Sequence, residues 1–299
     1  GVGMGKKLLW ASAIAAGTLL AVSNTMVNVA LRRKTAPQAP KLSAAEREEA
    51  WLSGAKYITH RNREDMRLRA WFIPQDSRRY AVICHGYGGN SKQMLARAKH
   101  FYDMGFNVLL PDARAHGGSD GRMIGMGWPE RRDIVEWVYE LLRRDEDAQI
   151  VLFGISMGAA TVMMTAGEVL PKQVKLVIED CGYTSAWEQF KAVMPPLYHT
   201  PPYPVLPVAS VLARLRTGYS FRRASALAQM RQCRIPVLFI HGEKDRLVPS
   251  SMALRLYGAA RCEKQLLIVP EAGHAEAAEK APELYWDTIR TFIEKYIGR

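Results

Sequence analysis

Apolar and polar residues follow two alternating patterns through most of the chain. Between Lys56 and Ile73 they alternate with a period of two, which indicates two strands with one buried face. Further along, short apolar runs of the buried-strand kind are separated by amphipathic helical segments such as 129–144. The apolar runs are 80–86, 106–113, 148–156, 174–181, 235–242 and 265–273. This alternation predicts an α/β fold with a doubly wound, mostly parallel sheet of eight strands and helices on both faces.

One interval, residues 183–231, interrupts the alternation. It shows no strand pattern, and it contains six prolines and many large apolar residues. A segment of this size inserted into a compact sheet is usually a lid or a binding loop. We therefore expect a helical, proline-rich lid at the carboxyl ends of the strands, where such sheets carry their function. The alternative is that its apolar residues only pack over the sheet.

The N-terminal segment from Leu8 to Leu31 contains no charged residue. As a helix, its 24 residues would be about 36 Å long, enough to cross a hydrocarbon core of about 30 Å. Three polar residues weaken its second half: Asn24, Thr25 and Asn28. Basic residues flank both ends, which argues against a helix buried in a globular core. The length and the lack of a clear cleavage site favour an uncleaved membrane anchor over a signal peptide.

These features divide the chain into three predicted parts. Residues 1–34 form a membrane anchor with basic flanks, residues 35–45 a linker, and residues 46–299 a folded domain that includes the 183–231 insertion. We expect a single-pass membrane protein whose short N-terminus stays inside and whose folded domain is extracytoplasmic.

Composition and charge narrow the class of protein. The 299 residues are 48% hydrophobic and 23% charged, as in a globular chain, and no repeat is visible. Residues 1–34 and residues 183–231 contribute +5 each to the net charge of +12, so the rest of the chain is nearly neutral. No basic stripe with interleaved aromatic residues and no nucleic-acid motif accompanies the charge. We therefore expect no nucleic-acid partner, and we expect an anionic membrane surface.

The clearest candidate for chemistry is the segment Gly154-Ile155-Ser156-Met157-Gly158. It follows an apolar strand and precedes a helix of small residues, which is the context of a nucleophile on a sharp strand-to-helix turn. Such a turn strains the serine, and glycine on both sides avoids a clash. The amide of Met157 at the start of the helix can face developing negative charge.

Three further segments supply the groups that a serine nucleophile needs. His85 to Gly89 follows the third strand and can offer the Tyr87 amide to an oxyanion, together with the amide of Met157. Asp245 follows the seventh strand and His274 the eighth, so the candidates occur in the order Ser156, Asp245, His274. Asp180, after the sixth strand, is the alternative acid.

On these motifs the sequence resembles the α/β-hydrolase superfamily, and within it the serine aminopeptidase-like branch of bacterial membrane-associated serine hydrolases. The resemblance covers about residues 56–297 and rests on HGYGG, PDARAHGGSDG, GWPERRDIVEWV, GISMGAAT, HGEKDRLVP and AGH. It implies the α/β-hydrolase fold and a Ser-His-Asp hydrolase that needs no cofactor. The segment PDARAHGGSDG departs from the Arg-Gly-His-Gly that relatives commonly have, but it does not touch the triad.

The reaction we expect is hydrolysis of a small acyl-ester substrate, of medium acyl or lipid-derived type, through an acyl-enzyme. Alternatives are a peptidase or amidase with the same triad, an acyltransferase or thioesterase, and a non-catalytic membrane-tethered binding module. An exopeptidase would need acidic groups for a free amine, and the 183–231 insertion offers only Glu188. Candidate substrate-binding residues are Trp187, Phe190, Tyr198 and Leu247.

The four cysteines suggest no metal site, because no CxxC or Cys/His spacing is present. Cys84 and Cys181 lie within strand-like runs and are expected to be buried apolar side chains. Cys233 and Cys262 each precede an apolar run. If those runs are adjacent parallel strands, a disulfide between the two is within reach.

Overall fold

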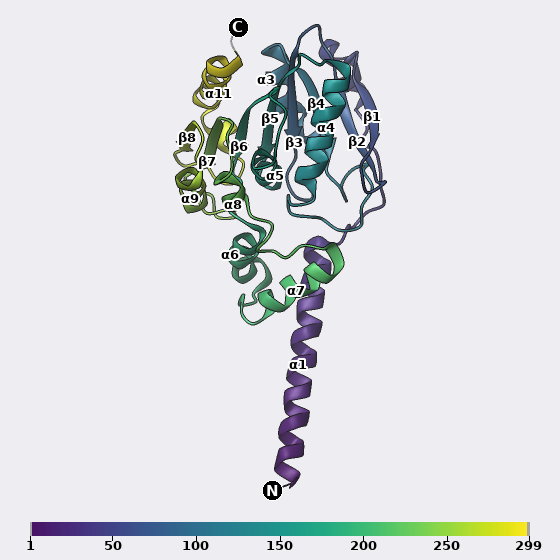
Figure 1. Cartoon of the computed structure of the whole chain (residues 1–299), viewed down its shortest axis with the longest axis vertical. Coiled ribbons are helices and arrows are strands. Elements are labelled where there is room, and N and C mark those ends of the chain that lie inside the picture. Colours follow the sequence, from purple (N-terminus) through teal and green to yellow (C-terminus); the bar gives the residue numbers. More distant parts are fainter. Residues whose placement is uncertain (1, 298–299) are drawn as a thin grey trace.

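The computed structural model describes residues 2–297 and contains one eight-stranded sheet (Figure 1). The strands are β1 (Lys56–Arg61), β2 (Arg67–Ile73), β3 (Arg79–Cys84), β4 (Asn107–Asp112), β5 (Gln149–Ile155), β6 (Val174–Asp180), β7 (Val237–Gly242) and β8 (Lys264–Val269). Their order is β1-β2-β4-β3-β5-β6-β7-β8. The β1–β2 and β2–β4 pairs are antiparallel, and all the others are parallel. The predicted eight-stranded, mostly parallel sheet is confirmed.

Helices cover both faces of the sheet (Figure 1). One face packs against α3 (Leu95–Asp103), α10 (Ala277–Lys280) and α11 (Pro282–Ile297), and the other against α4 (Glu130–Arg144), α5 (Met157–Ala166), α8 (Ala226–Met230) and α9 (Ser251–Ala259). Successive residues of a strand face opposite sides. In β5, Ile150 and Leu152 therefore join one core, while Val151 and Phe153 join the other. Burial on both faces explains why the strands read as continuous apolar runs.

The N-terminal helix α1 (Val2–Leu31) has two different halves. Its first half projects away from the domain (Figure 1), with Leu8, Trp10 and Ile14 between 67% and 71% exposed. Its second half packs against α7 (Val205–Thr217), and Val27 and Leu31 are buried there. From Met4 to Leu31 the helix is long and apolar enough to cross a membrane, a property that N-terminal signal sequences share.

The polar residues of the second half of α1 have partners in the domain. The Ser23 hydroxyl donates to the carbonyl of Val205, and the Arg216 guanidinium donates to the side-chain oxygens of Asn24 and Asn28. The polar residues of α1 thus lie in its second half, where the helix packs against the domain.

The segment predicted as a linker is bonded to the body of the protein. The Gln38 amide donates to the carbonyl of Gly117, and Trp71 Nε1 donates to the carbonyl of Pro40 at 3.2 Å. Just before the linker, the Arg33 amide donates to the carbonyl of Arg122. After this stretch come α2 (Ala44–Glu48), which a capping box opens at Ser43, and the 3-10 turn η1 (Ala50–Leu52). A second 3-10 turn, η2 (Ser91–Met94), leads into α3.

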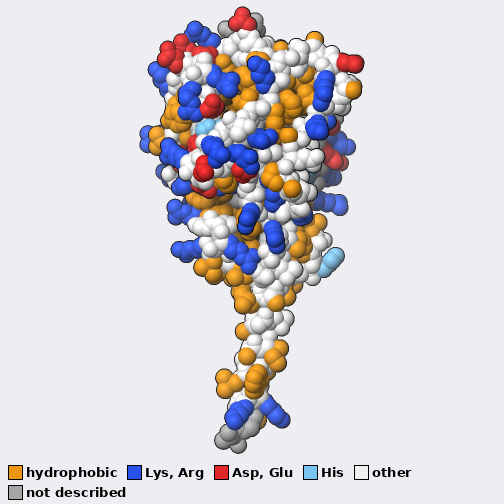
Figure 2. All heavy atoms as spheres, turned by 90° about the vertical axis from the view of Figure 1, so that its right-hand side faces the viewer, with side chains coloured by type: hydrophobic (Ala, Val, Ile, Leu, Met, Phe, Trp, Pro, Cys, Tyr) orange, Lys and Arg blue, Asp and Glu red, His pale blue; other side chains and the backbone are white. Residues whose placement is uncertain are grey.

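The 183–231 segment forms α6 (Ala186–Tyr198), α7 and α8 and contains no strand. Its first two helices lie at the end of the domain from which α1 emerges (Figure 1). In the view of Figure 2, this end shows basic and apolar side chains around the base of α1 and no acidic ones. Part of the basic excess of each region therefore lies together, since Arg216 of α7 bonds to Asn24 and Asn28 of α1, shortly before Arg32 and Arg33.

Candidate active site

The predicted site residues meet at one edge of the sheet. Ser156 directly follows β5, while Asp245 and His274 lie in the loops after β7 and β8. Tyr87 lies in the loop after β3. Because β3, β5, β7 and β8 run parallel, their carboxyl ends face the same way and bring these loops together.

Ser156 occupies a strained turn between β5 and α5. Its φ of 55° and ψ of −114° are rare for a residue with a side chain. A Cβ on Gly154 would lie 2.2 Å from the carbonyl oxygen of Gly158, and a Cβ on Gly158 would lie 2.2 Å from that of Cys84. Glycine is therefore required on both sides of the serine. The turn leaves the Ser156 hydroxyl free to face the neighbouring loops.

His274 links the serine to an acid. Its Nε2 lies 2.9 Å from Ser156 Oγ, and its Nδ1 lies 2.7 Å from Asp245 Oδ2. The other carboxylate oxygen of Asp245 accepts hydrogen bonds from the amides of Leu247 and Val248 at 2.9 and 2.8 Å. The carboxylate is thereby fixed in the position that orients the imidazole.

The surroundings of Asp245 keep it ionised. Burial by itself would raise the pKa of this carboxyl. Hydrogen bonds from His241, His274 and the Val248 amide more than offset burial and hold the pKa well below its ordinary range. A permanently charged acid can stabilise a positive imidazole beside it.

His241 is a neighbour of the acid that the sequence does not single out as part of the site. Its Nε2 lies 2.8 Å from the Val248 carbonyl and 3.4 Å from Asp245 Oδ2. Burial would lower the pKa of His241, but the hydrogen bond to Asp245 and the charge of Glu179 raise it. The only feature of the sequence that indicates a contact between His241 and Asp245 is the position of His241 at the end of β7, directly before Gly242.

Asp180, the alternative acid, is not bonded to His274. It is fully buried, and its Oδ2 accepts a hydrogen bond from the Tyr285 hydroxyl at 2.7 Å. Burial raises its pKa. The geometry therefore favours Asp245 as the partner of His274.

Two buried histidines hold the loop after β3. His85 Nε2 accepts from the Ala113 amide at 3.0 Å, and His116 Nε2 accepts from the Gly88 amide at 3.1 Å. Burial lowers the pKa of both rings, that of His116 to about 4, so both accept hydrogen bonds as neutral imidazoles. They fix the loop that carries the Tyr87 amide. The Met157 amide, at the first position of α5, has no acceptor in its own helix.

The structure also brings α1 to this loop. The Tyr87 hydroxyl donates to the carbonyl of Ala30 at 2.7 Å. Close by, Met26, Val27 and Ala30 of α1 line a small apolar cavity together with Phe190 and other residues of the 183–231 segment. The sequence does not predict this contact, although the polar residues in the second half of α1 are a signal of it.

The four predicted substrate-binding residues have different surroundings. Phe190 lines the apolar cavity beside α1, and Trp187 is buried under Arg222, whose guanidinium carbon lies 3.6 Å from the ring centroid. Tyr198 is half-buried at the end of α6. Leu247 is 36% exposed in the Asp245 loop, and its carbonyl accepts from the Gln189 side chain. Tyr198 and Leu247 are thus the accessible members of the set, while Trp187 and Phe190 are buried.

Cys181, Asp245 and His274 present one potential metal ligand each within 4.8 Å of one another. Both ring nitrogens of His274 are already in hydrogen bonds with Asp245 and Ser156. Burial raises the pKa of Cys181 well above its usual value, which disfavours the thiolate that a metal requires. The donor set therefore fits a hydrogen-bonded catalytic group better than a metal centre.

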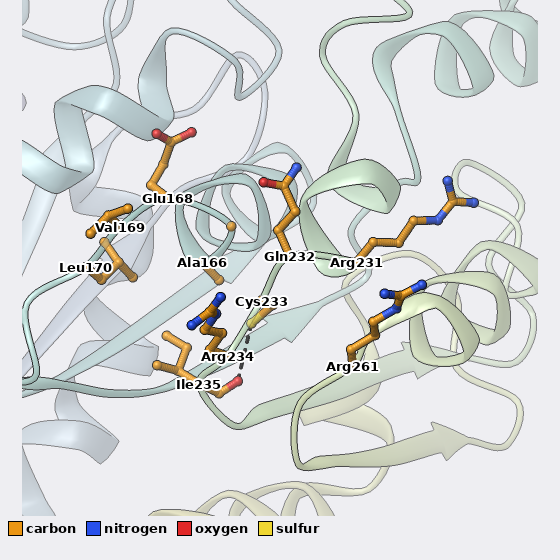
Figure 3. Close-up of a pocket in the computed structure, with 11 residues that line it drawn as sticks. Ala166, Glu168, Val169, Leu170, Arg231, Gln232, Cys233, Arg234, Ile235 and Arg261 are labelled. Carbon is orange, nitrogen blue, oxygen red and sulfur yellow. Dashed lines mark hydrogen bonds between the residues drawn. The ribbon is translucent and has the colours of Figure 1, made fainter.

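A cavity of about 750 Å³ lies at the opposite, amino-terminal edge of the sheet (Figure 3). Arg231, Arg234 and Arg261 line it, together with Cys233. The predicted disulfide between Cys233 and Cys262 is not formed there, because both cysteines are free thiols. The Cys233 thiol instead donates to the carbonyl oxygen of Ile235 at 3.3 Å.

Comparisons with known proteins agree with this architecture. Residues 81–287 match the Alpha/beta hydrolase family. The chain is 33% identical over 222 residues to the uncharacterized protein YqkD of Bacillus subtilis (strain 168), covering 74% of this chain and 73% of that protein. It is 26% identical over 266 residues to the alpha/beta hydrolase domain-containing protein WAV2 of Arabidopsis thaliana, covering 83% and 79%.

Solved structures share the fold at lower identity. The esterase Pf2001 of Pyrococcus furiosus superimposes with a TM-score of 0.70 at 21% identity, covering 89% of this chain and 100% of that chain. An acylaminoacyl peptidase of Pyrococcus horikoshii gives 0.63 at 16% identity, covering 82% and 42%. The chain belongs to the alpha/beta hydrolase family, as its motifs implied, and this membership supports a hydrolase activity.

Proposed function

We propose that the protein is a serine hydrolase that cleaves carboxylic esters, with Ser156 as nucleophile, His274 as general base and Asp245 as the orienting acid. The observation that carries this proposal is the continuous line of hydrogen bonds from Asp245 Oδ2 through both nitrogens of His274 to Ser156 Oγ. This line of hydrogen bonds ends at Ser156, on a strained turn of the kind that presents a nucleophile.

The first half of the reaction acylates the serine. His274 Nε2 takes the proton of Ser156 Oγ as the oxygen attacks the ester carbonyl, and Asp245 stabilises the positive ring. The amides of Tyr87 and Met157 donate to the oxyanion, and each such donor contributes about 3–4 kcal/mol in comparable sites. The protonated His274 then gives its proton to the departing alcohol.

The second half returns the enzyme to its starting state. His274 removes a proton from water, which attacks the acyl-enzyme carbonyl, and the same two amides stabilise the second oxyanion. The acid leaves, and the proton returns from His274 to Ser156. The cycle needs no group beyond these side chains and water.

The acidic groups near the site are not available to bind the free amine of a peptide, which favours an ester as the substrate. Glu188 lies 3.8 Å from Arg255, Asp180 is bonded to Tyr285, and Glu179 accepts from the Gly182 amide while fully buried. None of these three carboxyl groups is both accessible and unpaired. An amine subsite of the exopeptidase type therefore has no support in them.

We further propose that α1 anchors the protein and that α6 and α7 form a lid at the membrane surface. The uncharged, exposed stretch of α1 from Leu8 to Val22 would be about 22 Å long, and the long side chains of Lys6 and Lys7 before it can reach the head groups on the far side of a hydrocarbon core of about 30 Å. Beside it, apolar side chains of the 183–231 segment are 53–78% exposed: Leu197, Tyr203, Val211 and Leu215. Arg214 and Arg216, in the last turn of α7, favour anionic lipid at this surface. We keep the extracytoplasmic orientation of the domain as part of this proposal.

Ester kinetics test the proposal. The full-length protein in detergent should hydrolyse p-nitrophenyl butyrate and octanoate, and Ser156→Ala should remove this activity. Retained activity in a folded Ser156→Ala protein would refute the assignment.

Anionic vesicles test the membrane part separately. They should raise the rate on the octanoate ester, and Val211→Asp with Leu215→Asp should remove the enhancement. Leu254→Asp is the matched control, because Leu254 is 56% exposed on α9 and lies outside the 183–231 segment. Equal rates with and without vesicles would refute the lid at a membrane surface while leaving the esterase proposal intact.

A further inference from the structure

A cavity of about 550 Å³ lies between the segment that follows α1 and the loop that carries Tyr87. Its charged side chains are Arg32, Arg33, Lys34 and Lys41, all basic, and no acidic side chain lines it among the described residues. Like charges around one cavity repel each other unless an anion lies between them. We propose that this basic cavity binds the phosphate head group of a membrane lipid whose carboxylic ester is cleaved at Ser156, an assignment that rests on the function proposed above.

Three of the four cations are available to a ligand. Arg32, Lys34 and Lys41 are exposed, and none forms an ion pair within the part of the chain that the structure describes. The two acids whose charges act on Arg33 are already engaged: Asp112 accepts from the Tyr57 hydroxyl and from the Ser91 and Gly118 amides, and Asp120 pairs with Arg67 at 3.2 Å. A phosphate entering the cavity would therefore not have to displace a carboxylate.

The fourth cation makes the wall of the cavity rigid. The Arg33 guanidinium donates to the carbonyl oxygens of Thr35, Gly117 and Ser119. It thereby ties the segment after α1 to the loop after β4, in addition to the backbone bonds from the Arg33 and Gln38 amides. The cavity is thus preformed rather than made by two loose loops, which reduces the entropy lost when a ligand binds.

One loop contacts both the cavity and the nucleophile. Tyr87, Gly88 and Gly89 form part of its lining. Gly86, one residue before them, lies against the serine, because a Cβ on Gly86 would come 3.6 Å from the Ser156 Cβ. The loop therefore borders the basic cavity at Tyr87, Gly88 and Gly89 and approaches the nucleophile at Gly86, directly before the proposed oxyanion donor. A substrate whose ester is at Ser156 can extend its polar end past Tyr87 into the cavity.

The position of the cavity favours a lipid over a soluble phosphate ester. The lining of the cavity begins at Arg32, directly after the last residue of α1. The cavity therefore lies at the same end of the domain as the exposed half of α1 and the exposed residues of α6 and α7. In Figure 1 this is the end from which α1 emerges. Basic residues next to a membrane helix attract phosphate head groups.

A matched pair of substrates tests the head-group assignment. Oleoyl lysophosphatidic acid and monooleoylglycerol carry the same acyl ester on glycerol and differ by the phosphate. The ratio of kcat/KM for the phosphate lipid to that for the neutral lipid should exceed one in the full-length protein. Lys34→Gln combined with Lys41→Gln should lower this ratio about tenfold, through KM of the phosphate lipid. Because both lipids are measured on one preparation, loss of folded enzyme cancels in the ratio.

The control removes the same charge elsewhere. Lys172→Gln combined with Lys280→Gln changes two exposed lysines outside the cavity and should leave the ratio within about twofold. An equal drop in both double variants, or no drop in either, would overturn the cavity assignment. If free glycerol phosphate competed as well as the lipid, the ligand would be a soluble phosphate and the lipid assignment would be wrong.

The same assay separates this inference from the function on which it rests. Turnover of p-nitrophenyl butyrate that depends on Ser156, without preference for the phosphate lipid, would refute the head-group site and leave the esterase standing. Failure of a folded protein to turn over any of these esters would refute the esterase and the head-group site together.

Discussion

The two edges of the sheet each carry a cavity with arginine in its lining, yet they differ in what they can do. At the amino-terminal edge, the cavity of about 750 Å³ has Arg231 and Arg261 beside one another, with Cys233 bonded to the Ile235 carbonyl (Figure 3). It has no histidine and no strained residue among its lining. At the carboxyl-terminal edge, Ser156, His274 and Asp245 converge on a strained turn. Cavity volume alone therefore does not mark the site, whereas converging hydrogen bonds and backbone strain do.

The largest expected effect comes from removing the nucleophile. Ser156→Ala should lower kcat on p-nitrophenyl butyrate by about 10⁴-fold or more, because the remaining groups cannot form an acyl-enzyme. Steady-state kinetics on protein with an unchanged circular dichroism spectrum measure this effect. A loss smaller than tenfold would mean that the carboxyl-terminal edge is not where the chemistry occurs.

The proposed acid of the triad should have the next largest effect. Asp245→Asn keeps the shape but no longer enforces the His274 tautomer, so we expect kcat to fall about 10³- to 10⁴-fold. Asp180→Asn is the matched control, because Asp180 is bonded to Tyr285 instead of His274. A larger loss in the Asp180 variant would reverse the assignment of the acid.

The contact between α1 and the loop after β3 should have a moderate effect. Tyr87→Phe removes the hydroxyl that donates to Ala30, a bond with a net contribution of about 1 kcal/mol. We expect kcat to fall by about five- to tenfold with little change in KM, since the loop that holds the oxyanion donor becomes less ordered. Tyr139→Phe, on the exposed side of α4, is the control. A change in KM alone would indicate that Tyr87 contacts substrate instead of positioning the loop.

The pH dependence of stability tests the histidine that holds the same loop. The pKa of His116 is about 4 in the folded protein and about 6.5 in an unfolded chain. Between these values the unfolded state binds a proton that the folded state does not. The free energy of unfolding should therefore fall as the pH is lowered from about 6.5 to about 4, by up to about 1.4 kcal/mol per pH unit.

Urea unfolding of the wild type and of His116→Gln across this pH range isolates the contribution of His116 to the free energy of unfolding. The variant should show a shallower dependence, and the contributions of other groups cancel in the difference. Parallel curves would mean that His116 is not buried as a neutral acceptor for the Gly88 amide.

The smallest effect is expected at the amino-terminal edge. Arg234→Gln combined with Arg261→Gln should leave kcat and KM on p-nitrophenyl butyrate within about twofold, because neither side chain approaches the triad. A tenfold loss of kcat/KM in this variant would show that the amino-terminal edge of the sheet also influences the reaction.

Much of the fold follows from local patterns in the sequence, and the contacts made by α1 do not. The strands and the nucleophile turn are visible because burial on both faces and the Gly154–Gly158 spacing are local properties. Asn24 and Asn28 look only like weak points in a membrane helix until Arg216, far along the chain, is placed beside them. Long-range pairing of this kind leaves no periodic signal in the sequence.

The cysteine pair shows a second limit of prediction from the sequence. The prediction that Cys233 and Cys262 are neighbours depends on β7 and β8 being adjacent, and the structure has these strands side by side. Whether two neighbouring sulfurs form a bond depends on side-chain geometry and redox conditions, which strand patterns do not encode. The structure has them as free thiols.

Labelling with a fluorophosphonate tests the central claim most directly, because the probe phosphonylates a serine only when a neighbouring base activates it. Mass spectrometry of the treated full-length protein should find one adduct, on the peptide that contains Ser156. The adduct should be absent from Ser156→Ala and should form much more slowly on Asp245→Asn. An unlabelled folded protein, or an adduct on a serine other than Ser156, would contradict the assignment of Ser156, His274 and Asp245 as the catalytic triad.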